Sequence, residues 1–158
     1  MMAADFFQER ASMSRYEVGF DEVFPAPSSK IFKFFGTHEK VGLIFGGKFE
    51  RIKDGEDPKN PDGLGSVRRI SLPLPGPSFE ETVITFQPET LIEYIVSRGS
   101  PIKNHLGHIE FSDAPGGGTR VKYTIGFEPR IPGTGRLIAG ILKAGFKLGI
   151  PRVMKNLD

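Results

Sequence analysis

The chain has 158 residues, 38% of them hydrophobic, so it can bury one core without disulfide or metal staples. It has no cysteine, which excludes a disulfide framework, a thiol nucleophile and a thiolate metal site. Its 21 basic and 19 acidic residues nearly balance, which argues against nucleic acid as a partner, and no apolar run reaches the roughly 18 residues of a membrane span. We therefore expect a cytoplasmic protein with no integral membrane segment. The oligomeric state stays open, a dimer included.

The beginning of the chain predicts a tail followed by a strand. Residues 1–14 mix apolar and charged residues, and we expect a poorly ordered N-terminal tail. From Arg15 to Phe24 apolar and polar residues alternate, which predicts a β-strand. Residues 15–158 contain neither a repeat nor a linker, so they predict a single domain.

Two short helices should follow. Pro27 ends the extended segment, and Ser28 or Ser29 can cap a helix that begins there. Apolar residues recur at helical spacing, and Gly36 should break the segment into two helices. His38 lies in this region, and we expect it at the surface.

Six further strands are predicted, separated by short turns and one longer polar loop. They cover residues 48–54, 66–74, 79–86, 91–98, 105–113 and 119–129. In the last strand Val121, Tyr123, Ile125 and Phe127 alternate with polar residues and should face the core. Hairpin-length connections imply an antiparallel sheet, and helices on one side of it imply an α+β fold.

The segment from Thr134 to Leu157 predicts a long amphipathic helix. At about 100° per residue, its apolar face would comprise Leu137, Ile138, Ile141, Leu142, Gly145, Leu148 and Gly149, with Arg136, Lys143 and Lys147 opposite. Pro151 should kink the helix or end its first part, which would expose Phe146 and Ile150 as a contact patch. A basic amphipathic helix can also lie on a membrane surface, but here the sheet supplies an apolar partner.

Three stretches together resemble a known superfamily. They are residues 65–86, the break at Pro88 followed by LIEYIV, and above all GGGTRVKYTIGFEPRIPGTG before the terminal helix. The chain is similar over residues 15–157 to the SRPBCC superfamily, and within it to the START-like polyketide cyclase/dehydrase and lipid-transport group. The resemblance implies a helix-grip fold, in which a curved seven-stranded antiparallel sheet holds the C-terminal helix across a deep apolar ligand cavity. Members include carriers, receptors, cyclases and hydrolases, so the fold alone does not choose a function.

Two glycines of the terminal helix allow two interpretations. Gly145 and Gly149 lie four residues apart on the predicted apolar face, although a glycine inside a helix costs about 1 kcal/mol relative to alanine. They either leave volume for a ligand or allow another element to approach closely. On the first interpretation they border the cavity.

Histidines supply one set of candidate chemical groups. His105 shares strand parity with Ile109 and Phe111 and should face inward, whereas His108 should face outward. An inward histidine can act as a general acid or base, or can be a hydrogen-bonded polar group of the core. Because His105 and His108 point to opposite faces, they cannot chelate one metal ion, and we expect neither a metal nor a cofactor.

Charged residues and tyrosines supply the other set. We expect Arg68 and Glu81 inward on adjacent strands, where they could pair or anchor a polar ligand group. The alternative is a solvated outer face, because Ile84 and Phe86 favour the opposite parity for Glu81. Tyr94 should also face inward, with a hydroxyl that binds a ligand or a core partner.

Two functions are consistent with these patterns. The first is binding of a lipid or polyketide-like hydrophobic molecule between the sheet and the C-terminal helix. The second is a polyketide cyclase/dehydrase-type enzyme with His105 or Tyr123 as proton shuttle. The predicted ligand-binding residues are Arg68, Glu81, Tyr94, His105, Ile109, Phe111, Tyr123, Ile125, Ile141, Gly145, Leu148 and Gly149.

Overall fold

Seven strands form one antiparallel sheet in the computed structural model, which describes residues 15–157. The strands are β1 (Tyr16–Phe24), β2 (Lys48–Lys53), β3 (Val67–Ser71), β4 (Phe79–Gln87), β5 (Leu91–Arg98), β6 (Ile102–Asp113) and β7 (Thr119–Pro129), in the spatial order β1-β7-β6-β5-β4-β3-β2. All seven strands predicted from the sequence are present. The predicted tail lies outside the described residues.

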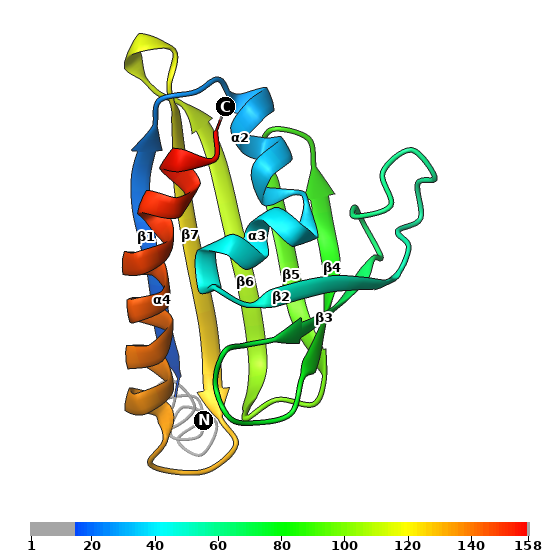
Figure 1. Cartoon of the computed structure of the whole chain (residues 1–158), viewed down its shortest axis with the longest axis vertical. Coiled ribbons are helices and arrows are strands. Elements are labelled where there is room, and N and C mark those ends of the chain that lie inside the picture. The colour runs from blue at the N-terminus through cyan, green and yellow to red at the C-terminus, as the bar shows by residue number, and fades with distance from the viewer. Residues whose placement is uncertain (1–14, 158) are drawn as a thin grey trace, which may run out of the picture.

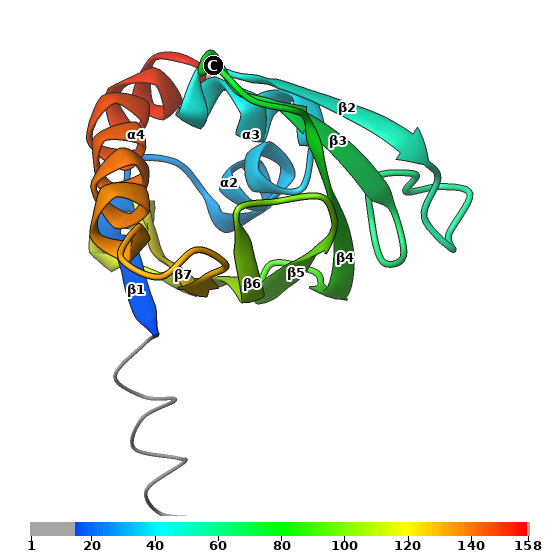
Figure 2. The ribbon, with the colours of Figure 1, turned by 90° about the horizontal axis from the view of Figure 1, so that it is seen from below.

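The sheet curves around the helices (Figures 1 and 2). Helices α2 (Ser28–Phe35) and α3 (His38–Phe45) follow β1, and α4 (Gly135–Lys155) ends the chain. Seen from below, all three helices lie on the concave side, with α4 beside β1 and α3 near β2 and β3 (Figure 2). This arrangement confirms the predicted α+β helix-grip fold, because one sheet and one long helix cover each other's apolar faces.

The two short helices form as predicted, but their cap differs. Gly36 is the C-cap residue of α2 and separates it from α3. The predicted serine cap is wrong, because Pro27 is the N-cap residue and no side chain caps the helix. The Ser28 hydroxyl instead donates to Oε1 of Glu89, 2.8 Å away at the β4–β5 turn.

Helix α4 buries only part of its predicted apolar face. Ile138 and Leu142 pack against the core and Gly149 is buried, as predicted, whereas Leu137, Ile141 and Leu148 are exposed. Phe146 is buried, so the expected Phe146 patch is wrong. The helix buries its smaller residues and Phe146, since the ring of Phe146 packs edge-on against Tyr123 with centroids 5.0 Å apart. The other buried residues of α4 are Gly135, Ala139, Gly149 and Val153.

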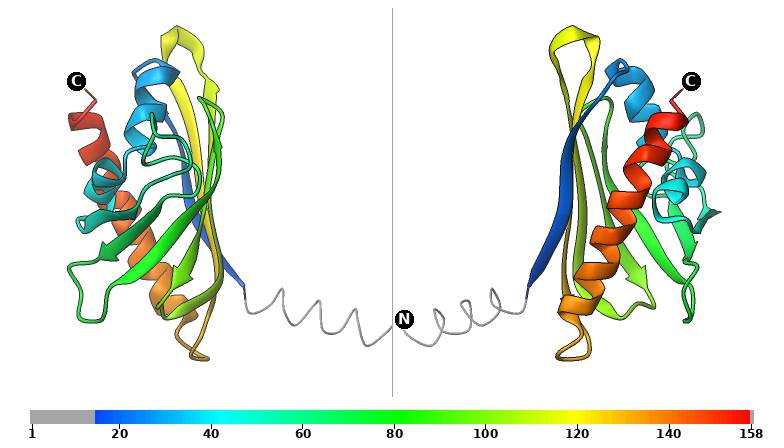
Figure 3. Two further views of the ribbon diagram at one scale, coloured as in Figure 1. Left: turned by 90° about the vertical axis from the view of Figure 1, so that its right-hand side faces the viewer. Right: turned by 60° about the vertical axis from the view of Figure 1, so that its left-hand side comes forward.

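Helix α4 also continues past its proline. Pro151 lies inside the helix, which ends only at Lys155, so the expectation that Pro151 might end its first part is wrong. Within residues 15–157, no helix has the length and apolarity needed to cross a membrane. The helix runs diagonally along the edge of the sheet formed by β1 (Figure 3).

A β-bulge resolves the ambiguous parity of β4. The register of β4 against β5 shifts between Val83 and Thr85, so one extra residue is accommodated there. Glu81 and Val83 are buried before the shift, Ile84 is exposed, and Phe86 faces the core again after it. The odd-numbered residues Glu81 and Val83 therefore face the core before the bulge, and the even-numbered Phe86 faces it after the bulge.

Candidate functional site

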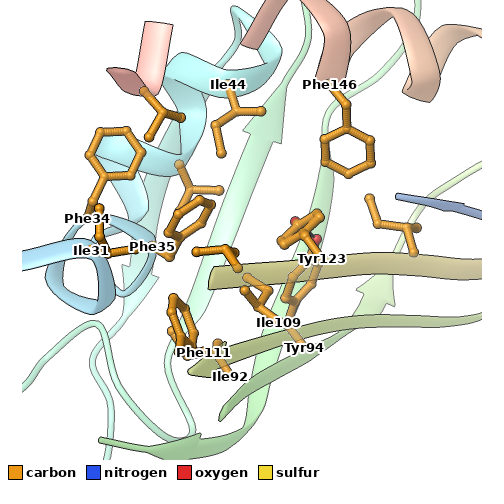
Figure 4. Close-up of a cluster of buried hydrophobic side chains, with 14 of the residues drawn as sticks. Ile31, Phe34, Phe35, Ile44, Ile92, Tyr94, Ile109, Phe111, Tyr123 and Phe146 are labelled. Atoms are coloured by element: carbon orange, nitrogen blue, oxygen red, sulfur yellow. Dashed lines mark hydrogen bonds between the residues drawn. The ribbon is translucent and has the colours of Figure 1, made fainter. Parts of the chain in front are cut away.

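Aromatic rings fill the half of the interior that α2 covers (Figure 4). Phe35 lies between Phe111 and Tyr123, with ring centroids 5.8 and 6.3 Å away. Phe146 reaches the same cluster from α4. Phe24, Phe32, Phe34, Phe86 and Phe20 complete a continuous series of mostly edge-to-face contacts. This cluster, called here the aromatic half, fills the interior between the sheet, α2 and Phe146 of α4.

The glycines of α4 belong to a helix contact. A Cβ atom on Gly149 would collide with the backbone oxygen of Ile44, and one on Gly145 would lie 3.1 Å from the ring of Phe45. Both glycines therefore bring α4 close to α3, and the prediction that they border a cavity is wrong. Of the two interpretations, close approach is the correct one.

A small cavity lies in the other half of the interior, between the sheet and the N-terminal part of α4. Its volume is about 60 Å³, which corresponds to about two water molecules. Its walls are apolar apart from Glu81, Tyr94 and His105, and they comprise Phe45, Phe49, Ile70, Leu72, Phe79, Val96, Ile102, Ile125 and Leu142 as well. The deep cavity implied by the family resemblance is thus reduced here to a small space, because phenylalanine rings occupy much of the interior.

An open apolar groove adjoins this cavity. Its volume is about 550 Å³, and the β3–β4 loop, the β5–β6 turn and Ile141 of α4 line it. Leu72 and Phe79 line both spaces, and both side chains are only half-buried. These two side chains form a shared wall between the groove and the cavity, so their movement would join the two spaces.

A buried ion pair lies beside the cavity. Arg68 and Glu81 are directly opposite each other on β3 and β4, and Nε and Nη2 of Arg68 donate to Oε2 of Glu81 at 2.9 and 2.7 Å. Burial raises the pKa of Glu81, while Arg68 acts in the opposite direction. The guanidinium also lies 4.5 Å from the centre of the Tyr94 ring. The predicted inward position of both charges is confirmed, and all three donor nitrogens of Arg68 are engaged within the protein, with Nη1 directed at His38.

His105 faces inward as predicted. Its Nδ1 atom accepts a hydrogen bond from the backbone amide of Val96 at 3.0 Å, so the neutral ring carries its proton on Nε2. Burial and the positive charges of Arg68 and Arg15 lower the pKa of His105 to about 4, which keeps the ring neutral at neutral pH. His108, in contrast, lies on the outer face and binds the carboxylates of Glu93 and Glu110.

The cavity therefore offers one donor and one acceptor. Within residues 15–157 no hydrogen bond engages Nε2 of His105 or Oε1 of Glu81. Every fully enclosed side-chain nitrogen or oxygen atom in that range has a partner, so these two atoms open onto the cavity that their residues line.

The two predicted tyrosines meet at the boundary between the two halves. Their hydroxyls form a hydrogen bond with each other, and burial raises the pKa of both. The ring of Tyr94 lines the cavity and covers Gly107, where any side chain would collide with it. Tyr123 is fully buried in the aromatic half and does not line the cavity.

His38 is buried, so the expectation of a surface position is wrong. Its Nε2 donates to Oγ of Ser66 at 2.9 Å, and Nη1 of Arg68 lies 3.3 Å from its Nδ1. Burial and Arg68 lower its pKa to about 4. Its position at the start of α3, where it packs under the polar loop before β3, could not be read from helical spacing alone.

The predicted ligand residues fall into separate places. Glu81, Tyr94, His105 and Ile125 line the cavity, and Ile141 lines the groove. Arg68 lies behind Glu81, Leu148 is exposed to solvent, and Ile109, Phe111 and Tyr123 belong to the aromatic half. Sequence reasoning missed Leu72 and Phe79, although the proline-rich run LPLPGPSF that contains both was a detectable sign of an unusual loop.

A second, wider groove has a different character. It has a volume of about 680 Å³ and lies along α3 and β2, with Lys48, Glu50, Arg51 and Asp62 among its lining residues. These four charges are paired within the protein, since Arg51 binds Asp62 and Lys48 lies 3.7 Å from Glu50. Because they already have partners, the cavity behind Leu72 and Phe79 is the better candidate site.

Comparisons with known proteins agree with this fold. The model of the family described as polyketide cyclase / dehydrase and lipid transport matches residues 20–158. A START superfamily protein from Mycobacterium smegmatis superposes with a TM-score of 0.71 at 10% identity, over 89% of this chain and 96% of that chain. The protein TTHA0849 from Thermus thermophilus gives 0.70 at 17% identity, over 90% and 97%. Truncated norcoclaurine synthase from Thalictrum flavum gives 0.65 at 14% identity, over 90% and 94%. No curated protein matches the sequence.

Proposed function

The chain belongs to the polyketide cyclase / dehydrase and lipid transport family of the SRPBCC superfamily, and we propose that it binds a hydrophobic small molecule. The observation that carries this proposal is the pair of adjoining apolar spaces with Leu72 and Phe79 between them. The groove of about 550 Å³ has the size of a small-molecule site, whereas the cavity of about 60 Å³ does not. The ligand's apolar body lies in the groove, and its polar end reaches the cavity past the two side chains.

The free atoms of the cavity define the polar end of the ligand. Nε2–H of His105 donates a hydrogen bond, and Oε1 of Glu81 accepts one. A hydroxyl group satisfies both, since it accepts from the histidine and donates to the carboxylate. A carboxylate ligand is disfavoured, because it would lie beside Glu81 while Arg68 is already engaged.

The same geometry supports binding over proton transfer. His105 is neutral, and its Nδ1 accepts a hydrogen bond from the amide of Val96. Its Nε2 carries the proton, so the ring can donate a hydrogen bond to a ligand but has no free nitrogen with which to abstract a proton. Tyr123 lies outside the cavity with a raised pKa. The alternative predicted from the sequence, with His105 or Tyr123 as proton shuttle, is therefore less well supported than binding.

Calorimetric titration with three flat probes tests the proposal. We expect 2-naphthol to bind about tenfold more tightly than naphthalene, the gain of about 1.4 kcal/mol expected for satisfied buried hydrogen bonds, and 2-naphthoate to bind most weakly. His105→Asn keeps an acceptor for the Val96 amide but removes the Nε2 donor, so it should abolish the preference for the hydroxyl and leave naphthalene binding intact.

Two controls define failure. Leu148→Ser changes an exposed apolar residue away from the groove and should bind like the wild type. Phe79→Trp enlarges the wall between groove and cavity and should weaken all three probes. If none of the probes binds, or if Leu148→Ser weakens binding as much as Phe79→Trp, the proposed site is wrong.

A further inference from the structure

Three connections meet at the end of the molecule where the groove opens. The β3–β4 loop (residues 72–78) and the β5–β6 turn (residues 99–101) line the groove together. The β7–α4 loop (residues 130–134) joins them through Arg130, whose backbone amide and Nε each donate to a carbonyl oxygen of the β5–β6 turn at 2.9 Å. All three connections lie in the lower part of Figure 1, and together with the first two turns of α4 we call them the loop end.

Large apolar side chains are exposed at the loop end. Leu74 is 48% exposed, Ile131 63% and Leu137 67%, and Ile141 follows one helical turn later. Leu74 and Ile141 line the groove. Single exposed apolar residues are ordinary on a protein surface, but four at one end of the molecule, two of them lining the groove, indicate an interaction surface.

The charges at the loop end all have one sign. Arg130 and Arg136 are exposed there, and Arg98, the last residue of β5, is exposed directly beside the β5–β6 turn, opposite Glu80 of β4. The segments 72–78, 98–101 and 130–142 contain no aspartate or glutamate. The whole of α4 likewise carries five basic residues and no acidic one. A partner of this surface must therefore combine an apolar interior with a negatively charged boundary.

We propose that the loop end docks on the surface of an anionic lipid bilayer. Leu74 and Ile131 enter the boundary between headgroups and acyl chains, while the arginines contact lipid phosphates; each basic residue near such a surface contributes about 1 kcal/mol. A second copy of the chain does not fit this surface, because arginine would face arginine. The apolar residues Leu74 and Ile131 lie on loops rich in proline and glycine, and loop tips can insert among mobile lipids more readily than they can match a fixed protein surface.

This docking would connect the groove with the bilayer. Leu74, one of the residues that enter the lipid, lines the groove, so an apolar molecule would have a short path from the bilayer to the groove. Docking itself does not depend on the proposed ligand binding. It requires only the exposed apolar residues and the arginines.

Co-sedimentation with vesicles tests the proposal. The full chain is mixed with vesicles of phosphatidylcholine alone or of phosphatidylcholine with phosphatidylserine. We expect binding to the anionic vesicles only, weakened by added salt. Leu74→Ser combined with Ile131→Ser should reduce the bound fraction at least about fivefold, since each substitution removes the burial of one aliphatic side chain. Arg98→Glu combined with Arg136→Glu should do the same.

Matched variants at the opposite end control for folding and for net charge. Val23→Ser removes an exposed apolar residue of β1. Lys30→Glu combined with Lys33→Glu reverses two exposed charges on α2, the same change in net charge as in the arginine double variant. Both variants should bind like the wild type. Absence of binding to both kinds of vesicle overturns the proposal, and it is also the result expected if an acidic protein is the true partner. Equal losses in Val23→Ser and in the loop-end double variant overturn it too. Naphthol binding measured on the same samples tells whether the proposed function survives.

Discussion

The aromatic half and the cavity half of the interior have the same sheet as their floor but differ in what fills them. In the aromatic half, rings from α2, α4 and the sheet contact one another closely, and the Tyr123 phenol is the polar group among them. In the cavity half, aliphatic side chains and the rings of Phe45, Phe49, Phe79 and Tyr94 surround an unfilled space of about 60 Å³, and Glu81 and His105 are among its lining residues. The comparison shows that side chains fill one half of the interior completely, whereas the other half, where we propose that the ligand's polar end binds, keeps a small space.

The largest expected effect is the loss of a ring from the aromatic half. Phe35→Ala should lower the free energy of unfolding by about 3–5 kcal/mol, because its neighbours cannot close the resulting space. Phe79→Ala removes the same number of atoms from a half-buried wall and should cost clearly less. Urea denaturation of the two variants measures the difference. Equal losses would contradict the division of the interior into two halves.

The buried ion pair should show the next largest effect. Arg68→Met leaves Glu81 buried without its partner, and we expect a loss of about 3 kcal/mol in the free energy of unfolding. Combining Arg68→Met with Glu81→Leu should recover much of that loss, because no unpaired charge remains. Urea denaturation of the single and double variants provides the comparison. A double variant as unstable as the single one would mean that the pair is needed for more than mutual neutralisation.

Acid should destabilise the protein through its two buried histidines, His105 at the cavity and His38 beneath the polar loop before β3. The pKa of His105 and that of His38 are each about 4 in the folded protein, against 6.5 when unfolded, so the unfolded chain binds more protons between these values. Their contribution is present above about pH 6.5 and is lost as the pH falls toward 4, by at most about 3 kcal/mol for each histidine. Urea denaturation across this pH range should show a smaller acid loss in His105→Asn than in the wild type. An unchanged pH profile would contradict the neutral state assigned to His105.

The smallest expected effects on stability come from alanine substitutions at two glycines of α4, Gly140 and Gly149. Gly140 is exposed with open space around it, so Gly140→Ala should raise the free energy of unfolding by about 0.4–1 kcal/mol. Gly149→Ala should lower it, because the added methyl group meets the backbone of Ile44. Thermal unfolding of the two variants measures these opposite shifts. Stabilisation by Gly149→Ala would mean that α4 and α3 are not in close contact.

Some features of the cavity half could be read from the sequence. Strand parity placed Tyr94 and His105 inward, and cross-strand order brought Arg68 opposite Glu81. Parity could not place Leu72 or Phe79 at the cavity wall, because that depends on how a proline-rich loop folds against distant turns. It also could not reveal the β4 bulge, since a bulge is visible only against the partner strand.

The alternation of apolar residues and the spacing of turns determined the antiparallel sheet, the two short helices and the long C-terminal helix, because these periods follow from local backbone geometry. The family resemblance supplied the helix-grip arrangement. Only the tertiary structure decided which face of α4 is buried. Gly149 packs against α3 and Phe146 packs against Tyr123, and these two contacts fix the rotation of the helix even though it leaves Leu137 and Leu148 exposed. That choice leaves Leu137 exposed to solvent and Ile141 exposed in the groove, although periodicity alone predicts that both are buried.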